Sequence, residues 1–248
     1  MSAALDTLAR RIQDAKRLTI LTGAGVSAAS GVPTFRGSAG LWRRYRAEDL
    51  ATPEAFANNP LLVWEWYAWR REMILACQPN PAHDVIAAWS LRPGCQVLTQ
   101  NVDDLHVRAG TRSLARIHGS IWELSCWEQC ERGATPWRDE SVPFATLPPR
   151  CPHCGGLARP AVIWFGESLR SDDLRTAFRA TACDVFIAVG TSAVVYPAAG
   201  LMHEARGGGA FTVEINPEAT PASATVDLAI HAAAEVALPQ VARLMKRP

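Results

Sequence analysis

Residues 18–37 read LTILTGAGVSAASGVPTFRG, and this stretch decides the fold that we expect. Its opening apolar run ends at Thr22-Gly23, which predicts a buried strand followed by a glycine turn. Segments long enough for helices separate this run from later ones, and residues 4–16 and 60–76 have helical patterns. The later apolar runs that read as strands are residues 95–99, 161–165, 184–189, 210–215 and 226–230. Strands that alternate with helices indicate βαβ units, so the sequence predicts an α/β fold with a parallel sheet.

Gly23, Gly25 and Ala28 follow the first strand at the spacing of a dinucleotide-binding fingerprint, with alanine in the third place. Glycines at such positions permit a tight turn and let the backbone approach a pyrophosphate. The spacing alone is a weak signal, because a plain strand-to-helix turn uses the same residue types. The acidic residue that normally binds a ribose would be Glu48 or Asp49, but neither closes a second clear strand. An ordinary Rossmann domain therefore fits this stretch poorly.

Length and composition exclude several classes of protein. The 248 residues are 48% hydrophobic and 20% charged, which is typical of a globular chain with one large domain or one domain and a smaller insert. No apolar run approaches about 18 residues and the N-terminal segment has no apolar core, so we expect neither a membrane span nor a secretory signal. The net charge of +1 gives no electrostatic case for binding nucleic acid. Seven cysteines, an odd number, argue against a disulfide framework and favour the cytoplasm.

Two close pairs of cysteines have the spacing of a zinc site. Cys151 and Cys154 are separated by two residues, whereas Cys126 and Cys130 are separated by three. Four thiolates can close a tetrahedral site around a structural zinc ion, which we expect here. Because the first pair is one residue longer, the assignment of Cys130 as a ligand stays open, and His153 is the other nearby candidate. Free buried cysteines are the alternative to a metal site.

Several segments together resemble the sirtuin family of NAD-dependent protein-lysine deacylases. The glycine-rich residues 22–37 are similar to one signature of that family, and residues 99–110 (TQNVDDLHVRAG) are similar to the other. His118-Gly119 and the two cysteine pairs follow at the spacing of the family. The remaining matches, in family order, are Phe165-Gly166-Glu167, Gly190-Thr191-Ser192, Val195-Tyr196-Pro197 and Asn216. The resemblance therefore covers nearly the whole chain.

The resemblance implies an enzyme that removes acyl groups from protein lysines with NAD as co-substrate and releases nicotinamide and O-acyl-ADP-ribose. It also implies a Rossmann-like NAD-binding domain of residues 1–38, 83–121 and 161–248. Residues 39–82 and the insert 122–160 would form a smaller domain with a helical part and a zinc module, and we expect the insert to be a metal-stapled segment rather than a stretch of core. Acylated-lysine proteins or peptides would be the partners, without nucleic acid or membrane. Two alternatives stay open: mono-ADP-ribosyl transfer, and a non-catalytic NAD-sensing module.

The resemblance also implies roles for individual residues. His118 would be the base that activates a ribose hydroxyl, since an imidazole titrates near neutral pH. Gln100 and Asn101 would contact the nicotinamide ribose or order a water, with Asn101 as the second catalytic residue, and Asp103 would accept from the nicotinamide carboxamide. The family's adenine loop usually opens with glycine, where this chain has Ala232. The positions that would bind NAD are Gly23, Ala24, Gly25, Ser27, Ala28, Pro33, Thr34, Phe35, Arg36, Trp42, Gln100, Asn101, Val102, Asp103, Gly190, Thr191, Ser192, Asn216, Pro217, Glu218 and Ala234.

Tyr67 and Arg70 lie three residues apart in the predicted helix 60–76, so they share a face, whereas Arg71 faces elsewhere. The pair matches the YxxR motif of the sirtuin branch that prefers succinyl and malonyl groups, and Asp104 also resembles that branch. On any other helix such a pair would be a surface aromatic and a solvated arginine. The acylated peptide would add as a strand between two loops. The positions that would bind this substrate are Tyr67, Arg70, Phe165, Gly166, Glu167, Val195 and Tyr196.

Overall fold

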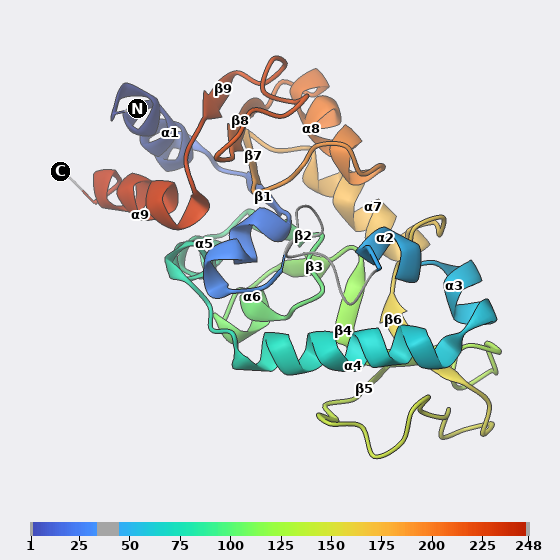
Figure 1. Cartoon of the computed structure of the whole chain (residues 1–248). Helices are drawn as coiled ribbons and strands as arrows, with labels where there is room; N and C mark the ends of the chain where they lie inside the picture. Colours follow the sequence, from blue (N-terminus) through green and yellow to red (C-terminus); the bar gives the residue numbers. More distant parts are fainter. Residues whose placement is uncertain (1, 34–44, 247–248) are drawn as a thin grey trace.

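A six-stranded parallel sheet forms the centre of the molecule (Figure 1). The computed structural model describes residues 2–33 and 45–246. The strand order is β3-β2-β1-β7-β8-β9, which is the Rossmann order of a doubly wound sheet. The strands are β1 (Leu18–Thr22), β2 (Cys95–Thr99), β3 (Leu114–Arg116), β7 (Val185–Val189), β8 (Phe211–Ile215) and β9 (Leu228–Ile230). The predicted α/β fold with a Rossmann-like parallel sheet is therefore confirmed.

The central strands of this sheet end level with one another. Thr22, the last residue of β1, lies opposite Thr99 of β2 and Val189 of β7. Chain order reverses between β1 and β7, because β2 and β3 lie on one side of β1 and the later strands on the other. Open α/β sheets bind ligands in the crevice at such a switch point, so the fold directs attention to the turns that follow these strands.

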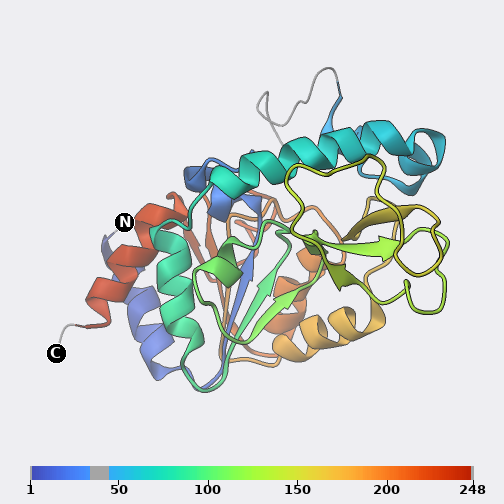
Figure 2. The ribbon, with the colours of Figure 1, turned by 90° about the horizontal axis from the view of Figure 1, so that it is seen from below.

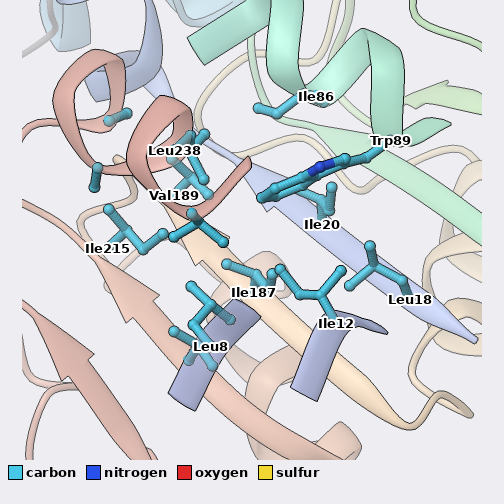
Figure 3. Packing of buried hydrophobic residues seen from close by; sticks show 14 of the residues in the cluster. Leu8, Ile12, Leu18, Ile20, Ile86, Trp89, Ile187, Val189, Ile215 and Leu238 are labelled. Atoms are coloured by element: carbon cyan, nitrogen blue, oxygen red, sulfur yellow. The ribbon is translucent and has the colours of Figure 1, made fainter. Parts of the chain in front are cut away.

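Helices cover both faces of the parallel sheet and enclose two cores. In β7, Ile187 points into the first core (Figure 3). Its neighbour Phe186 packs into the second, because successive side chains of a strand face opposite ways. The helices of the first face, which lie together in Figure 2, are α1 (Ser2–Asp14), α5 (Pro81–Ser90) and α9 (Ala234–Leu244). Those of the second face are α7 (Ser171–Ala180) and α8 (Ala198–Gly207). Among the described residues, no helix is both long and apolar enough to cross a bilayer.

A second sheet, antiparallel and of order β5-β4-β6, builds a further core together with the helices that pack against it. Figure 1 shows the long helix α4 running beside this sheet. Helix α4 has the predicted bounds because Pro60 begins it and the Asn59 side chain accepts a hydrogen bond from the Leu62 amide at 3.1 Å. The elements of this part are α2 (Ala47–Leu50), α3 (Pro53–Asn58), α4 (Pro60–Ala76), β4 (Gly119–Cys126), β5 (Trp137–Arg138) and β6 (Ala158–Val162).

The expectation that the insert 122–160 holds no core is wrong. Trp122, Leu124 and Ala158 are buried in the core of the second sheet. Their side chains find partners because helix α4, far away in the sequence, packs against the strands of the insert. A short apolar pattern within the insert therefore acquires a core only in the folded chain. The division of the chain into two domains stays a prediction.

The strand expected at residues 161–165 is also displaced, since β6 ends at Val162. The following residues leave the sheet because other groups take their backbone amides. The Trp164 amide donates to Glu167 Oε2 at 2.8 Å, and the Phe165 amide donates to the Ala51 carbonyl at 2.9 Å. The apolar run thus continues past the strand as a loop.

Arg71 ties helix α4 to the second sheet. Its side chain is fully buried, its Nε donates to the Ile121 carbonyl at 2.8 Å, and its Nη1 lies 2.5 Å from Asp139 Oδ1. Burial lowers the pKa of the guanidinium, although the carboxylate of Asp139 opposes this shift. A buried charge is stable only when it is paired and hydrogen-bonded, so these contacts fix the helix that carries Tyr67 and Arg70.

We expect Arg71→Met to lower the free energy of unfolding by about 2 to 4 kcal/mol, because the Ile121 carbonyl and Asp139 lose a charged donor inside the protein. Chemical denaturation followed by circular dichroism measures this change. Arg70→Met is the matched control, because it removes the neighbouring arginine, which is only half-buried. Equal losses of stability in the two variants would contradict this role of Arg71.

Candidate functional site

A cavity of about 850 Å³ lies at the carboxyl ends of the parallel strands. The residues that directly follow β1, β2, β7 and β8 all line it, and these are Gly23, Gln100, Gly190 and Asn216. The cavity therefore occupies the switch point of the sheet, where α/β folds bind their ligands.

The glycine turn after β1 touches the turn after β7. The Gly25 amide donates to the Gly190 carbonyl at 2.9 Å. A Cβ atom at Gly23 would lie 2.7 Å from the Gly190 oxygen, and one at Gly25 would lie 2.7 Å from the Gly190 Cα. Gly190 itself has a φ of +59°, in the left-handed region that favours glycine. This backbone contact is possible only without side chains, and all three glycines line the cavity.

A buried polar network holds the glycine turn from below. The Asn101 side-chain amide donates to the Gly23 carbonyl at 3.1 Å and to Ser27 Oγ at 3.2 Å. Ser27 Oγ in turn donates to Asp103 Oδ2 at 2.7 Å. Ser27 lies in η1 (Ala24–Ser30), a 3₁₀-helix that follows the turn. Two polar residues after β2 thus anchor the segment after β1, so the two strand ends form one unit.

Asp103 is more enclosed than the sequence suggested. Its side chain is buried, and its Oδ1 accepts a hydrogen bond from the Leu105 amide at 2.9 Å, at the start of α6 (Leu105–Arg108). Burial raises the pKa of this carboxyl group, while the bonds from Leu105 and Ser27 oppose the shift. Asp103 does not line the cavity among the described residues. Its contact with a nicotinamide carboxamide stays a prediction.

His118 is half-buried between β3 and β4 and lines the cavity. Its Nδ1 lies 3.2 Å from the Gln100 carbonyl oxygen. Since a carbonyl oxygen can only accept, Nδ1 carries the proton of the neutral ring and Nε2 keeps a lone pair. Burial lowers the pKa of His118, so the ring is mostly neutral at pH 7. This imidazole can therefore accept a proton at Nε2, as a general base does.

Tyr67 and Arg70 line the same cavity from helix α4, far from the glycine turn in the sequence. The Tyr67 hydroxyl accepts a hydrogen bond from Trp164 Nε1 at 2.9 Å, and burial raises the pKa of Tyr67 to about 12, so it is protonated. The Arg70 guanidinium lies 4.9 Å from the centre of the Trp66 ring. Burial lowers its pKa, although an arginine stays charged at neutral pH. The helix thus presents a cation and a hydroxyl to one cavity.

Asp104, which the sequence also matches to the acyl-selective branch, lies away from the cavity wall. Its buried carboxylate accepts from Arg116 Nη1 at 3.0 Å, Arg138 Nη1 at 2.5 Å and Ser120 Oγ at 3.0 Å. These bonds join the end of β2 to β3, β4 and β5. Asp104 therefore links the two sheets and does not line the cavity among the described residues.

The cavity collects most of the residues predicted for NAD and all of those predicted for the acylated substrate. The predicted NAD-binding positions that line it are Gly23, Ala24, Gly25, Gln100, Asn101, Val102, Gly190, Thr191, Ser192, Asn216, Pro217 and Glu218. Those among the described residues that do not line it are Ser27, Ala28, Pro33, Asp103 and Ala234. Ala234 packs into the first core at the start of α9 instead. The predictions that lie outside the described residues are Thr34, Phe35, Arg36 and Trp42.

Other residues of the cavity wall were not singled out from the sequence. Trp164 lines the cavity, but the sequence analysis did not single it out, because the apolar run 161–165 predicts a strand. Residues 219–221 also line it, and their signal was available, because they follow the Asn216-Pro217 turn after a strand of the parallel sheet. Glu48 lines it too, although the sequence offered this residue only as a ribose contact of an ordinary Rossmann domain.

The two cysteine pairs come together into a cluster with zinc-site geometry. Their four sulfur atoms lie within 4.8 Å of one another, with 3.5 Å between Cys126 and Cys154 and 3.8 Å between Cys130 and Cys151. Tetrahedral zinc with Zn–S bonds of about 2.3 Å needs sulfur atoms about 3.8 Å apart. The four residues therefore fit a structural zinc ion, with Cys130 as a ligand and without His153.

The backbone accommodates the longer spacing of the first pair. Gln129 has a φ of 50°, a left-handed conformation that tightens the loop between Cys126 and Cys130. The chain then returns over the cluster, where the Gly133 carbonyl accepts from the Cys126 amide at 2.7 Å. A Cβ atom at Gly133 would lie 2.8 Å from Cys130 Sγ and 2.9 Å from Cys151 Sγ. Glycine is thus required for the sulfur atoms to converge.

Comparison with known proteins gives concordant matches. The sequence pattern of the Sir2 family matches residues 23–197. An NAD-dependent protein deacylase of Aquifex aeolicus is 46% identical over 226 residues, which are 90% of this chain and 93% of that protein. The solved complex of a Sir2 homologue with NAD has a TM-score of 0.90 at 45% identity and covers 97% of this chain and 94% of that one. A Sir2 protein solved with a myristoylated histone peptide has a TM-score of 0.79 at 30% identity, covering 100% of this chain and 98% of that one.

We expect Cys130→Ser to lower both the zinc content and the melting temperature, because a structural metal contributes folding free energy. A loss of about 2 kcal/mol would lower the Tm by roughly 4 to 8 °C in a chain of this size. Metal analysis and thermal unfolding measure the two effects. Cys183→Ser is the control, since Cys183 is buried outside the cluster and its replacement should leave the zinc content unchanged. Wild-type zinc content and Tm in Cys130→Ser would exclude Cys130 as a ligand.

Proposed function

The chain belongs to the Sir2 family and is an NAD-dependent protein deacylase, and we propose that it prefers lysines that carry succinyl or malonyl groups while also accepting acetyl groups. The observation that supports this proposal is a single cavity, which holds the glycine turn, His118 and the Tyr67–Arg70 pair. One enclosure can then bind the dinucleotide, perform the acyl transfer and read the end of the acyl chain.

In this proposal NAD lies along the ends of the parallel strands. The backbone from Gly23 to Gly25 can approach the pyrophosphate, because no side chain projects from the two glycines. Residues 190–192 would contact the adenosine side, and Asn216 would contact its ribose. The Asn216 side chain already donates to the Thr191 carbonyl at 3.2 Å, so the turns after β7 and β8 support each other.

His118 is proposed as the general base. NAD supplies the ribose, whose anomeric carbon accepts the acyl carbonyl oxygen as nicotinamide leaves. His118 then takes the proton of a ribose hydroxyl at Nε2, while the bond from Nδ1 to the Gln100 carbonyl keeps the ring in the required tautomer. Asn101 stays oriented by its bonds to Gly23 and Ser27, in a position to contact the nicotinamide ribose.

The acyl preference rests on the cation of Arg70 and the hydroxyl of Tyr67, which both line the cavity. A succinyl or malonyl group ends in a carboxylate, and bringing that charge into a partly apolar cavity is unfavourable unless it is paired. The guanidinium of Arg70 offers forked donors to a carboxylate, and Tyr67 offers a hydroxyl from the same helix face. Acetyl-lysine makes neither contact, so it should bind less tightly. The alternative, a solvated surface pair, does not fit two residues that line the cavity wall.

Acylated proteins or peptides are the proposed partners, and the cytoplasm is the proposed location. The peptide would lie extended between the loops 165–167 and 195–197, which both line the cavity. Phe165 and Tyr196 are exposed there, with 40% and 78% of their surface accessible. Main-chain pairing gives affinity with little demand on the peptide sequence, so a broad range of acylated sites should be accepted.

We expect His118→Ala to lower deacylation by about 100- to 10,000-fold, because general-base help typically contributes that much. Incubation with labelled NAD and an acylated peptide measures it and separates the alternatives. Deacylation consumes both reagents, mono-ADP-ribosyl transfer labels protein, and a non-catalytic NAD module does neither. NAD binding by the variant is the control for folding. Activity within a few-fold of the wild type would exclude His118 as the base.

The pH dependence of deacylation is an independent test of His118 as the general base. Only the neutral ring of His118 accepts a proton, and burial lowers its pKa from the ordinary value of about 6.5. Activity should therefore be constant above about pH 6.5 and should fall only at lower pH, as the ring becomes protonated.

For acyl choice we expect kcat/KM for succinyl-lysine to exceed that for acetyl-lysine by about 10- to 150-fold, mainly through KM, as one hydrogen bond to a charged group would give. Arg70→Met should remove most of that advantage and affect acetyl-lysine less. Rates on peptides that differ only in the acyl group measure both. A wild type that prefers acetyl-lysine, or an Arg70→Met variant that slows both substrates equally, would refute this role of the pair.

A further inference from the structure

The hydroxyl of Tyr67 receives its hydrogen bond from a residue that sequence motifs do not mark. Trp164 Nε1 lies 2.9 Å from the Tyr67 oxygen, and both side chains are buried in the wall of the cavity. We propose that Trp164 is a positioning residue for acyl specificity, which turns the Tyr67 hydroxyl so that it donates to the carboxylate of an acidic acyl group. This inference rests on the proposed function and names a further determinant of it.

The direction of the hydrogen bond follows from the chemistry of the two groups. An indole N–H can only donate, so the Tyr67 oxygen is the acceptor and its own proton stays available. Within the described part of the chain, no acceptor takes that proton. Because burial raises the pKa of Tyr67 to about 12, the proton is present at any working pH. Helix α4 places the hydroxyl in the cavity wall together with Arg70, so its remaining donor serves the cavity.

Trp164 can orient Tyr67 because it is itself held firmly. Its backbone amide donates to Glu167 Oε2 at 2.8 Å. Glu167 is fixed in turn by Arg159, whose Nη1 and Nη2 donate to the two carboxylate oxygens at 2.5 and 2.8 Å. The Arg159 guanidinium also lies 3.6 Å from the centre of the Trp164 ring. Phe56 packs against the same ring with 5.3 Å between centres. These contacts hold the indole ring so that its N–H points toward Tyr67 in helix α4.

The arrangement favours acidic acyl groups over neutral ones. A phenol without a fixed donor can turn its oxygen or its proton toward a ligand. With the Trp164 N–H on its oxygen, the Tyr67 hydroxyl is set to donate, which suits a carboxylate that can only accept. Donor chains of this kind also polarise one another, so the indole strengthens the hydroxyl as a donor. Acetyl-lysine has no acceptor at the end of its acyl group and gains nothing from this arrangement.

The test is the ratio of kcat/KM for succinyl-lysine to that for acetyl-lysine in Trp164→Phe, which keeps an aromatic ring and removes the N–H. We expect the ratio to fall about two- to tenfold, through KM for succinyl-lysine, which is the range of one neutral hydrogen bond. Where Trp164→Phe folds poorly, 3-benzothienylalanine at position 164 replaces only the N–H by sulfur and keeps both rings. A ratio unchanged in these variants would overturn the proposal.

A double-mutant cycle shows whether Trp164 acts through Tyr67. In a Tyr67→Phe background there is no hydroxyl to orient, so adding Trp164→Phe should leave the ratio unchanged. An equal fall in both backgrounds would mean that Trp164 shapes the cavity without Tyr67, and would overturn the proposal.

Trp64→Phe is the matched control for lost stability. Trp64 lies in the same core, and its Nε1 donates to the Ala158 carbonyl at 2.9 Å instead of to Tyr67. This variant should lower the Tm and leave the ratio unchanged, and a lowered ratio would count against the proposal. Arg70→Met separates the two levels of inference. If it preserves the ratio, the acyl preference itself fails; if it lowers the ratio while Trp164→Phe does not, only the role of Trp164 fails.

Discussion

The contact between the glycine turn after β1 and the turn after β7 is the constraint on which the site depends. Gly25 and Gly190 meet backbone to backbone, with no room for a Cβ atom between them. This contact is possible because β1, β2 and β7 end in register, so that their following residues reach the same level. Hydrogen bonds among Ser27, Asn101 and Asp103 hold the turn, and the main chain of Gly23 and Gly25 lines the cavity.

Helix α4 lines the same cavity through Tyr67 and Arg70, and its two adjacent arginines show how the helix is held there. Arg71 points into the core of the second sheet and bonds the Ile121 carbonyl and Asp139. Arg70, about 100° further round, reaches the cavity beside Tyr67. The helix is thus held on one side by a buried charge and offers a second charge on another. In the proposed function, recognition of the acyl group therefore depends on the packing of the core around the second sheet.

The cysteine cluster and Asp104 stabilise the same second sheet from different places. The sulfur atoms bring the end of β4 and the loop after it together with the segment before β6. Asp104 accepts hydrogen bonds from Arg116 and Arg138 in neighbouring strands. Neither group lines the cavity among the described residues. The wall residues Trp164 and Glu167 follow β6, the strand that comes after the second cysteine pair.

The residues expected to bind NAD came from the resemblance to the sirtuin family. Sequence patterns alone predicted the parallel α/β sheet, the glycine turn after its first strand and the two cysteine pairs. These follow from local signals: apolar runs that end in glycine or polar residues, cysteine spacing, and motifs whose members are close in the chain. Features that depend on contacts between distant segments could be seen only in the tertiary structure. Examples are the Trp164–Tyr67 hydrogen bond across 97 positions, the core inside the insert 122–160, and the convergence of Cys130 through Gly133. The direction of Arg71 into a core and the burial of Asp103 belong to the same group. Such features arise where two distant segments come into contact, and the residue pattern within either segment does not predict that contact.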